Sequence, residues 1–159
     1  MQELPKPWFD IEGYKKIRLL EARYESELAR RFLEEGLVRG AAGKAYQAWK
    51  ALVAAFAAED RSKLKDLFKG VVKVRGNRVI EKVDWVIAIM PSNVLKRVSQ
   101  LIGGDISVYT NLAILIHQYQ YNGPDKSGLL SQYWDDESAK ADIIQLLEVI
   151  DRILHERGI

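Results

Sequence analysis

Apolar residues recur every three or four positions over long parts of this chain, which is the spacing of an amphipathic helix. The pattern predicts a helix over residues 10–35 and a second, alanine-rich helix over residues 39–59. Gly36 stands between them, where a glycine commonly ends a helix. Small residues along the second helix would let another helix approach it closely.

The middle of the chain has a less regular pattern. Residues 62–69 predict a short amphipathic helix. Valine-rich runs flank Gly76-Asn77 and predict either a small β-hairpin near residues 71–80 or an irregular loop, because Gly-Asn suits the turn of a hairpin. A short helix over residues 80–89 should end before Pro91, since the residue that precedes a proline disfavours helical backbone.

Two further segments follow this proline. A helix over residues 93–102 is expected, with Ser92 as its N-cap and Gly103-Gly104 at its end. Asp105 could then cap a helix over residues 106–120. The β-branched residues of that segment also permit a buried strand, so the pattern alone leaves both alternatives open.

The C-terminal part predicts one more long helix. Residues 122–125, Asn-Gly-Pro-Asp, form a strong helix breaker, after which Asp135 or Asp136 would cap a helix that runs to about residue 156. Four substantial helices and several short ones result. An antiparallel bundle is the simplest way to bury their apolar stripes, so we expect an all-α protein in which residues 1–159 form a single helical domain.

Composition excludes several classes of protein. Hydrophobic residues make up 48% and charged residues 29% of the chain, which fits a folded globular protein and not a disordered one. Without cysteine, and with only two histidines far apart, neither a disulfide nor a metal or other cofactor is expected. No apolar run reaches the roughly 18 residues of a membrane span, and the N-terminus lacks the apolar core of a signal peptide. We therefore expect a cytoplasmic protein with no membrane association. The many Glu, Lys and Arg residues are typical of a thermophile.

Positive charge is concentrated between residues 61 and 82. This segment holds eight Lys or Arg residues and two acidic ones, a local charge of +6 against +2 for the whole chain. Such a segment could follow a phosphate backbone, with Lys73, Arg75 and Arg78 as the candidate nucleic-acid contacts. A solvated surface without a ligand is the alternative, because Phe68 is the only aromatic residue among these charges.

One of the two histidines lies at the polar end of the apolar segment 110–119. This segment resembles the signature of the HEPN superfamily of helical domains, in which Arg-Asn, a short apolar spacer and His-x-Tyr form a metal-independent ribonuclease site. Asn111, His117 and Tyr119 match that signature, whereas Thr110 stands in the place of the arginine. The resemblance favours a helix here over a strand.

The resemblance also implies roles for the matching residues. His117 would be the acid–base group, since histidine exchanges a proton near neutral pH, and Asn111 and Tyr119 would position it. Thr110 cannot supply the positive charge that an arginine offers to a phosphate. The candidates for a substitute cation are Lys44, Lys50 and Lys126. The alternative for His117 is a structural histidine at a helix end or a dimer interface.

Longer stretches resemble the archaeal PaREP family of small proteins. The residues that carry this resemblance are 22–29, 36–51, 83–92 and 119–125. That family has no settled activity and is in turn similar to HEPN domains. HEPN domains commonly form homodimers, and many pair with nucleotidyltransferases or act as toxins, while others have lost their catalytic residues. The resemblance therefore implies a HEPN-like fold and a homodimer.

Two hypotheses for function follow. The first is a non-catalytic HEPN-like binding or interaction module with a degenerate ribonuclease site, which contacts RNA or a partner protein. The second is a metal-independent endoribonuclease, as the toxin of a toxin–antitoxin pair or as the partner of a nucleotidyltransferase. In the second hypothesis such a partner would modify Tyr119, and a lysine would replace the missing arginine.

Overall fold

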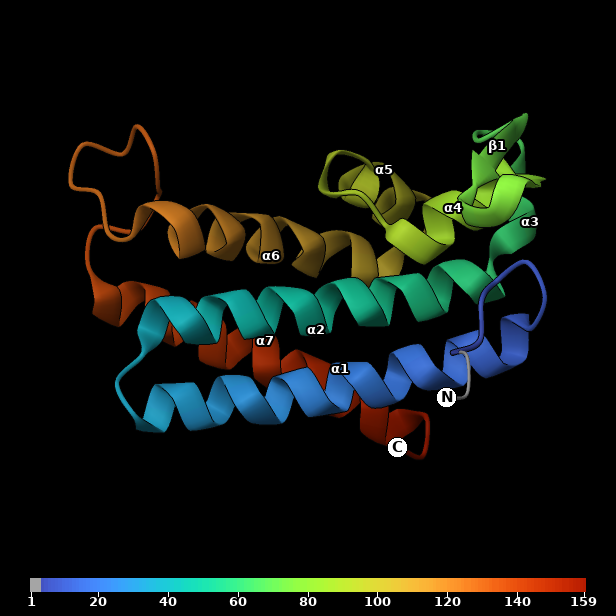
Figure 1. The fold of residues 1–159 in the computed structure, drawn as a ribbon. Helices are drawn as coiled ribbons and strands as arrows, with labels where there is room; N and C mark the ends of the chain where they lie inside the picture. The colour runs from blue at the N-terminus through green and yellow to red at the C-terminus, as the bar shows by residue number, and fades with distance from the viewer. Residues whose placement is uncertain (1–3) are drawn as a thin grey trace.

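Long helices dominate the computed structural model, which describes residues 4–159 (Figure 1). The four longest are α1 (Ile11–Glu34), α2 (Val38–Glu59), α6 (Gly104–Asn122) and α7 (Asp136–Glu156). Between α2 and α6 the chain forms α3 (Arg61–Lys65), β1 (Val71–Val74), a 3-10 turn (Arg75–Asn77), β2 (Arg78–Glu81), α4 (Lys82–Ile89) and α5 (Ser92–Ile102). The predicted all-α bundle with short accessory helices and a small hairpin is confirmed.

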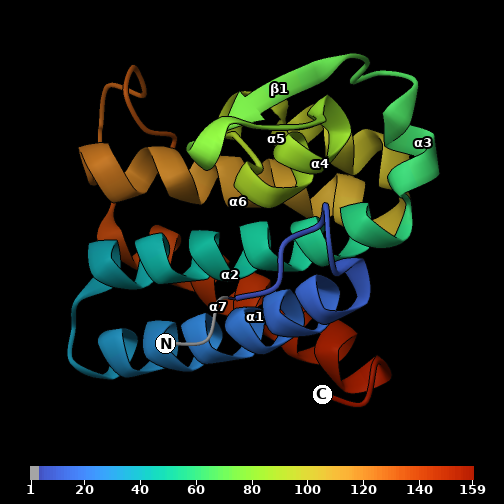
Figure 2. The ribbon, with the colours of Figure 1, turned by 45° about the vertical axis from the view of Figure 1, so that its right-hand side comes forward.

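In Figure 1, α1 and α6 run from right to left and α2 and α7 from left to right, so each long helix is antiparallel to the next. Helix α2 is central and contacts α1, α6 and α7 along the bundle. It also contacts α4 and α5, which lie between the hairpin and the long helices (Figure 2). None of the helices in residues 4–159 is both long enough and apolar enough to cross a membrane.

The sequence of α2 explains its central position. Most of its buried residues are alanines, which let neighbouring helices approach closely. Its glycines mark the closest approaches: a Cβ atom on Gly40 would lie 2.9 Å from the ring of Phe32 in α1, and one on Gly43 would lie 2.8 Å from the side-chain amide of Gln120 in α6. The expected close packing against α2 is confirmed on both sides.

The β-hairpin forms as an antiparallel pair in which Val71 faces Glu81 and Val74 faces Arg78. Gly76 and Asn77 form its turn with φ angles of +80° and +61°. This left-handed backbone suits glycine, which has no Cβ atom to clash, and asparagine, whose short polar side chain can form local hydrogen bonds. The hairpin, one of two alternatives from the sequence, is therefore the correct one.

An ion-pair network closes the base of the hairpin. The guanidinium of Arg61, the first residue of α3, donates from Nε to Asp84 Oδ1 over 2.7 Å and also bonds to Glu81. Asp84 is buried, with 5% of its surface exposed. The segment from α3 to the start of α4, which contains the hairpin, thus has its two ends fixed to each other. We call these three residues the clamp.

Two predicted helix caps are wrong. Pro91 and not Ser92 occupies the N-cap of α5, and the Ser92 hydroxyl lies 2.8 Å from the Tyr46 hydroxyl of α2. Helix α6 begins at Gly104, which places Asp105 inside its first turn. In both cases the side chain contacts a residue of another helix instead of capping its own: Ser92 contacts Tyr46 of α2, and Asp105 forms an ion pair with Arg152 of α7. The predicted helix over residues 62–69 is also shorter, because α3 ends at Lys65.

The start of α7 follows the sequence prediction. Asp135 is its N-cap, and a carboxylate oxygen accepts a hydrogen bond from the backbone N–H of Ser138 over 2.8 Å. This bond lowers the pKa of Asp135. The apolar face of α7 then contacts α1, α2 and α6, which completes the bundle.

Candidate functional site

Thr110, at the position of the superfamily arginine, lies in the core. It has no exposed surface, and its hydroxyl oxygen accepts a hydrogen bond from the indole N–H of Trp49 over 2.8 Å. The same hydroxyl donates to the carbonyl of Ile106 over 2.7 Å. A buried tryptophan needs such an acceptor. Position 110 therefore serves the packing of α2 against α6 and does not face a cleft.

His117 is half-buried between α2 and α6. Its ring stacks on that of Tyr46, with centroids 3.9 Å apart and an angle of 17° between the planes. The ring of Tyr121 meets it edge-on at 5.2 Å, and its Nδ1 lies 3.3 Å from Gln120 Oε1. Burial lowers the pKa of His117 below its ordinary value of about 6.5. Burial therefore favours the neutral form of the imidazole, which can accept a proton.

Of the three candidate cations, Lys50 is the one whose charge acts on His117. It lowers the pKa of the imidazole, in the same direction as burial does. The other two have different neighbours: Lys44 pairs with Glu25 of α1 over 3.5 Å, and Lys126 lies over the ring of Trp134, 4.2 Å from its centroid. Lys50 is thus the candidate that the electrostatics of His117 favour, and its role as a substitute cation stays a prediction.

Asn111 and Tyr119 do not join His117 within one chain. At about 100° of rotation per residue, Asn111 lies about 120° and Tyr119 about 160° around α6 from His117. Asn111 is exposed, whereas Tyr119 is fully buried and its hydroxyl donates to Asp136 over 2.6 Å. Burial and this carboxylate raise the pKa of Tyr119. The three predicted catalytic residues point in three directions, and their roles remain predictions.

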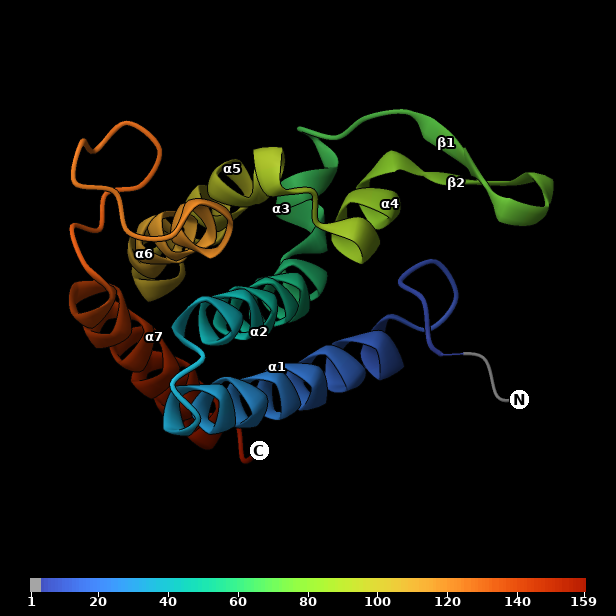
Figure 3. The same ribbon diagram turned by 60° about the vertical axis from the view of Figure 1, so that its left-hand side comes forward.

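The predicted nucleic-acid contacts lie on a groove of about 680 Å³ between the hairpin, the N-terminal segment and α4. Figure 3 shows these elements together at one end of the molecule. The basic residues of its lining are Lys6, Lys73, Arg75 and Arg78, and the aromatic ones are Trp8, Phe9 and Trp85. We call it the hairpin groove. Its aromatic wall could not be predicted from the charge pattern, because these rings come from segments outside the charged one.

Ion pairing separates the basic residues of the 61–82 segment into two groups. Arg61, Lys63 and Lys65, in or next to α3, pair with carboxylates. Lys73, Arg75 and Arg78 form no ion pair with any of residues 4–159. Lys69 and Lys82, on either side of the hairpin, also form no ion pair within residues 4–159, so the uncompensated positive charge of this segment lies on the hairpin and next to it.

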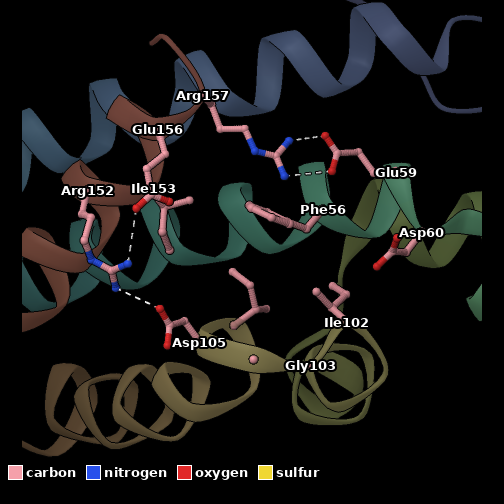
Figure 4. A pocket seen from close by; sticks show the side chains of 12 residues that line it. Phe56, Glu59, Asp60, Ile102, Gly103, Asp105, Arg152, Ile153, Glu156 and Arg157 are labelled. Carbon is pink, nitrogen blue, oxygen red and sulfur yellow. Dashed lines mark hydrogen bonds and ion pairs between the residues drawn. The ribbon is translucent and has the colours of Figure 1, made fainter.

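A second pocket, of about 450 Å³, lies between α2, α6 and α7 (Figure 4). Arg157 forms two hydrogen bonds with Glu59, and its guanidinium lies 4.1 Å from the centroid of the Phe56 ring. Arg152 pairs with Asp105 over 3.0 Å. Each carboxylate of the lining forms an ion pair, but Asp105 and Glu156 share Arg152, so the lining carries more negative than positive charge. Residues 4–159 contain no group of His, Cys, Asp and Glu that could hold a metal ion.

Comparison with known proteins gives a family. The family model of the archaeal PaREP1/PaREP8 family matches residues 17–144, which run from α1 into α7 and include the hairpin and the segment around His117. No curated protein and no solved structure matches the chain significantly. The match covers well over half of the 159 residues. The chain therefore belongs to the archaeal PaREP1/PaREP8 family.

Proposed function

We propose that this protein is a binding module that holds RNA without cleaving it, on a HEPN-like bundle whose ribonuclease site is degenerate. One observation carries this proposal: Thr110 is sealed in the core by its hydrogen bond to Trp49, so the position that would supply the catalytic cation is unavailable to a substrate. The dispersion of Asn111 and Tyr119 around α6 supports it.

The free positive charge of the hairpin supports RNA as the ligand. Lys73, Arg75 and Arg78 are exposed, and none has a carboxylate partner among the described residues. Lysine and arginine side chains in this state bind phosphates and release counterions, which favours association with nucleic acid. We further propose that the protein is cytoplasmic and, as the HEPN resemblance implies, a homodimer. A nucleotidyltransferase is the protein partner that the same resemblance implies.

A second candidate function, metal-independent RNA cleavage, is supported by a different observation. His117 has a lowered pKa and lies within the electrostatic reach of Lys50. A neutral imidazole next to a cation is a suitable pair for proton abstraction at a phosphate ester. This pair would have to act without Asn111 and Tyr119 of the same chain.

An RNA-cleavage time course in EDTA distinguishes the two functions. The wild-type protein, His117→Ala and Lys50→Gln would each be incubated with end-labelled single-stranded RNA, and the products separated on denaturing and native gels. We expect full-length RNA in all three denaturing gels and a retarded band in the native gels. Cleavage by the wild type that both substitutions abolish would overturn the proposal in favour of the ribonuclease.

A further inference from the structure

The hairpin groove combines two kinds of wall. Its basic wall is the hairpin, and its other wall consists of aromatic and aliphatic side chains of the N-terminal segment and α4. Phe9 and Ile89 on that second wall each expose 51% of their surface. Exposed apolar side chains grouped in a groove commonly mark a binding site. In the hairpin groove these apolar side chains lie beside cations that form no ion pair. The site therefore fits a ligand that has both flat apolar faces and negative charge.

The aromatic wall is held in place. The Lys6 carbonyl accepts hydrogen bonds from the backbone N–H groups of Phe9, over 3.2 Å, and Asp10, over 2.9 Å. This turn presents the Trp8 and Phe9 rings edge to face, with centroids 6.2 Å apart. Trp85 comes from α4 and packs partly against the core. A site whose rings are fixed beforehand loses less entropy when a ligand binds.

The basic wall is also fixed, because the clamp ties the base of the hairpin to α3 and α4. The backbone of the turn then places Arg75 and Arg78 at its two ends, one on each side of Gly76-Asn77. Lys73 comes from β1 and lines the same groove. The cations and the rings therefore line one groove.

We infer that the hairpin groove binds an unpaired strand of RNA, with bases on the rings of Trp8, Phe9 and Trp85 and phosphates on Lys73, Arg75 and Arg78. This inference rests on the proposed RNA binding and adds the site and the form of the ligand. Unpaired bases expose their faces for stacking on aromatic side chains, while the backbone follows basic residues. A double helix hides those faces.

The size of the groove agrees with this ligand. Its volume of about 680 Å³ lies in the range of sites that hold small molecules. It therefore admits a few nucleotides and is too small for a duplex. A duplex could touch the hairpin cations from outside, but it would leave the aromatic wall unused.

The test measures fluorescence anisotropy of dye-labelled oligonucleotides with the full-length protein: single-stranded RNA, the same RNA as a duplex, and single-stranded DNA. The variants are Phe9→Ala, which changes a half-exposed ring, and Trp8→Leu with Trp85→Leu, which keeps apolar volume but removes both indoles. The control is Trp134→Leu, since Trp134 is 60% exposed in the loop between α6 and α7, away from the groove. Thermal unfolding of each variant checks that it is folded.

We expect the wild type to bind single-stranded RNA at least about tenfold more tightly than the duplex. The double tryptophan variant should bind at least about 25-fold more weakly, because it loses two base–aromatic stacks that are each worth about fivefold or more, and Phe9→Ala should weaken binding in the same direction. Trp134→Leu should bind as the wild type does. Equal binding of single-stranded DNA also supports the inference, because its bases offer the same faces.

Other outcomes overturn it in distinguishable ways. If single strand and duplex bind equally, or if the folded aromatic variants bind as the wild type does, RNA binding stands and the stacking site is wrong. If the wild type binds no RNA even at low salt, the proposed function itself fails, and the inference fails with it.

Discussion

A single hydroxyl decides what position 110 can do. Thr110 fills the space between α2 and α6. Its hydroxyl accepts a hydrogen bond from the indole N–H of Trp49 and donates one to the carbonyl of Ile106. An arginine at the same place would bring a guanidinium into the core with no carboxylate prepared for it. The residue that departs from the HEPN signature is thus a packing residue in this chain.

Thr110→Arg should therefore not restore a catalytic site. We expect it to lower the free energy of unfolding by about 3–5 kcal/mol, the cost of an uncompensated buried charge. Thr110→Val should cost about 1–3 kcal/mol, because it leaves the Trp49 indole N–H without an acceptor. Urea unfolding measures both, with the exposed neighbour Asn111→Ala as the control. A normally stable Thr110→Arg protein that cleaves RNA would show that the position faces a cleft after all.

The charge of Lys50 gives a second test at this scale. Lys50→Gln removes a positive charge that disfavours the imidazolium form, so the pKa of His117 should rise. Titration of the histidine ring protons by NMR measures the change. Lys44→Gln is the matched control, because Lys44 pairs with Glu25 and should leave the imidazole unchanged. An unchanged His117 pKa in Lys50→Gln would contradict the proximity of the two groups.

The lowered pKa of His117 also sets the sign of a pH effect on stability. Below about pH 6.5 the unfolded chain takes up the proton first, since the folded state holds the imidazole neutral. Folding stability should therefore decrease as the pH falls from about 6.5 through the lowered pKa. In Lys50→Gln this decrease should be smaller, which the unfolding midpoint at several pH values would show.

At the scale of elements, local patterns predict a helix well and its first residue less well. The recurrence of apolar residues every three or four positions predicts the ends of α1, α2 and α7 to within about one residue, and Gly76-Asn77 predicts the hairpin turn. Ser92 and Asp105 have the side chains of N-caps, but each has a partner on another helix. No local rule contains such a long-range partner, so these two caps could not be predicted.

The clamp should contribute to the stability of the protein, because it joins the hairpin to α3 and α4. Arg61→Gln leaves the buried Asp84 carboxylate without its cation, which should lower the free energy of unfolding by about 3 kcal/mol. Lys65→Gln is the control, since its pair with Glu81 is exposed and should be worth less than about 1 kcal/mol. Urea unfolding of both variants checks this. If the two variants are equally stable, the clamp does not hold the hairpin to the bundle.

At the scale of the molecule, the sequence predicted the bundle and the basic side of the groove but not the groove itself. Lys73, Arg75 and Arg78 are close in sequence, so their shared charge is visible there. Trp8 and Trp85 meet them through the fold alone. The predicted catalytic residues Asn111, His117 and Tyr119 are close in sequence, but the fold separates them, because residues near each other on a helix can point in different directions.

Charge is also arranged on the scale of the whole molecule. The 61–82 segment carries +6, while the rest of the chain is net negative. A triple variant, Lys73→Ala with Arg75→Ala and Arg78→Ala, should weaken RNA binding and make its logarithmic salt dependence shallower by about 2. A triple variant with the same loss of charge on exposed residues of α1 and α5, Lys16→Ala with Arg31→Ala and Arg97→Ala, should keep the wild-type slope. Equal slopes for the two triple variants would mean that the phosphates lie elsewhere.

The clamp has one more consequence, for how this protein can change over evolution. Because Arg61, Glu81 and Asp84 bring the two ends of the insertion together, the chain between them can gain or lose residues while the long helices keep their positions. Entropy makes a longer loop only slightly more costly, by about 0.6 kcal/mol for each doubling of its length. The bundle and the hairpin can therefore diverge at different rates, and relatives with hairpins of other lengths should retain the same helical framework.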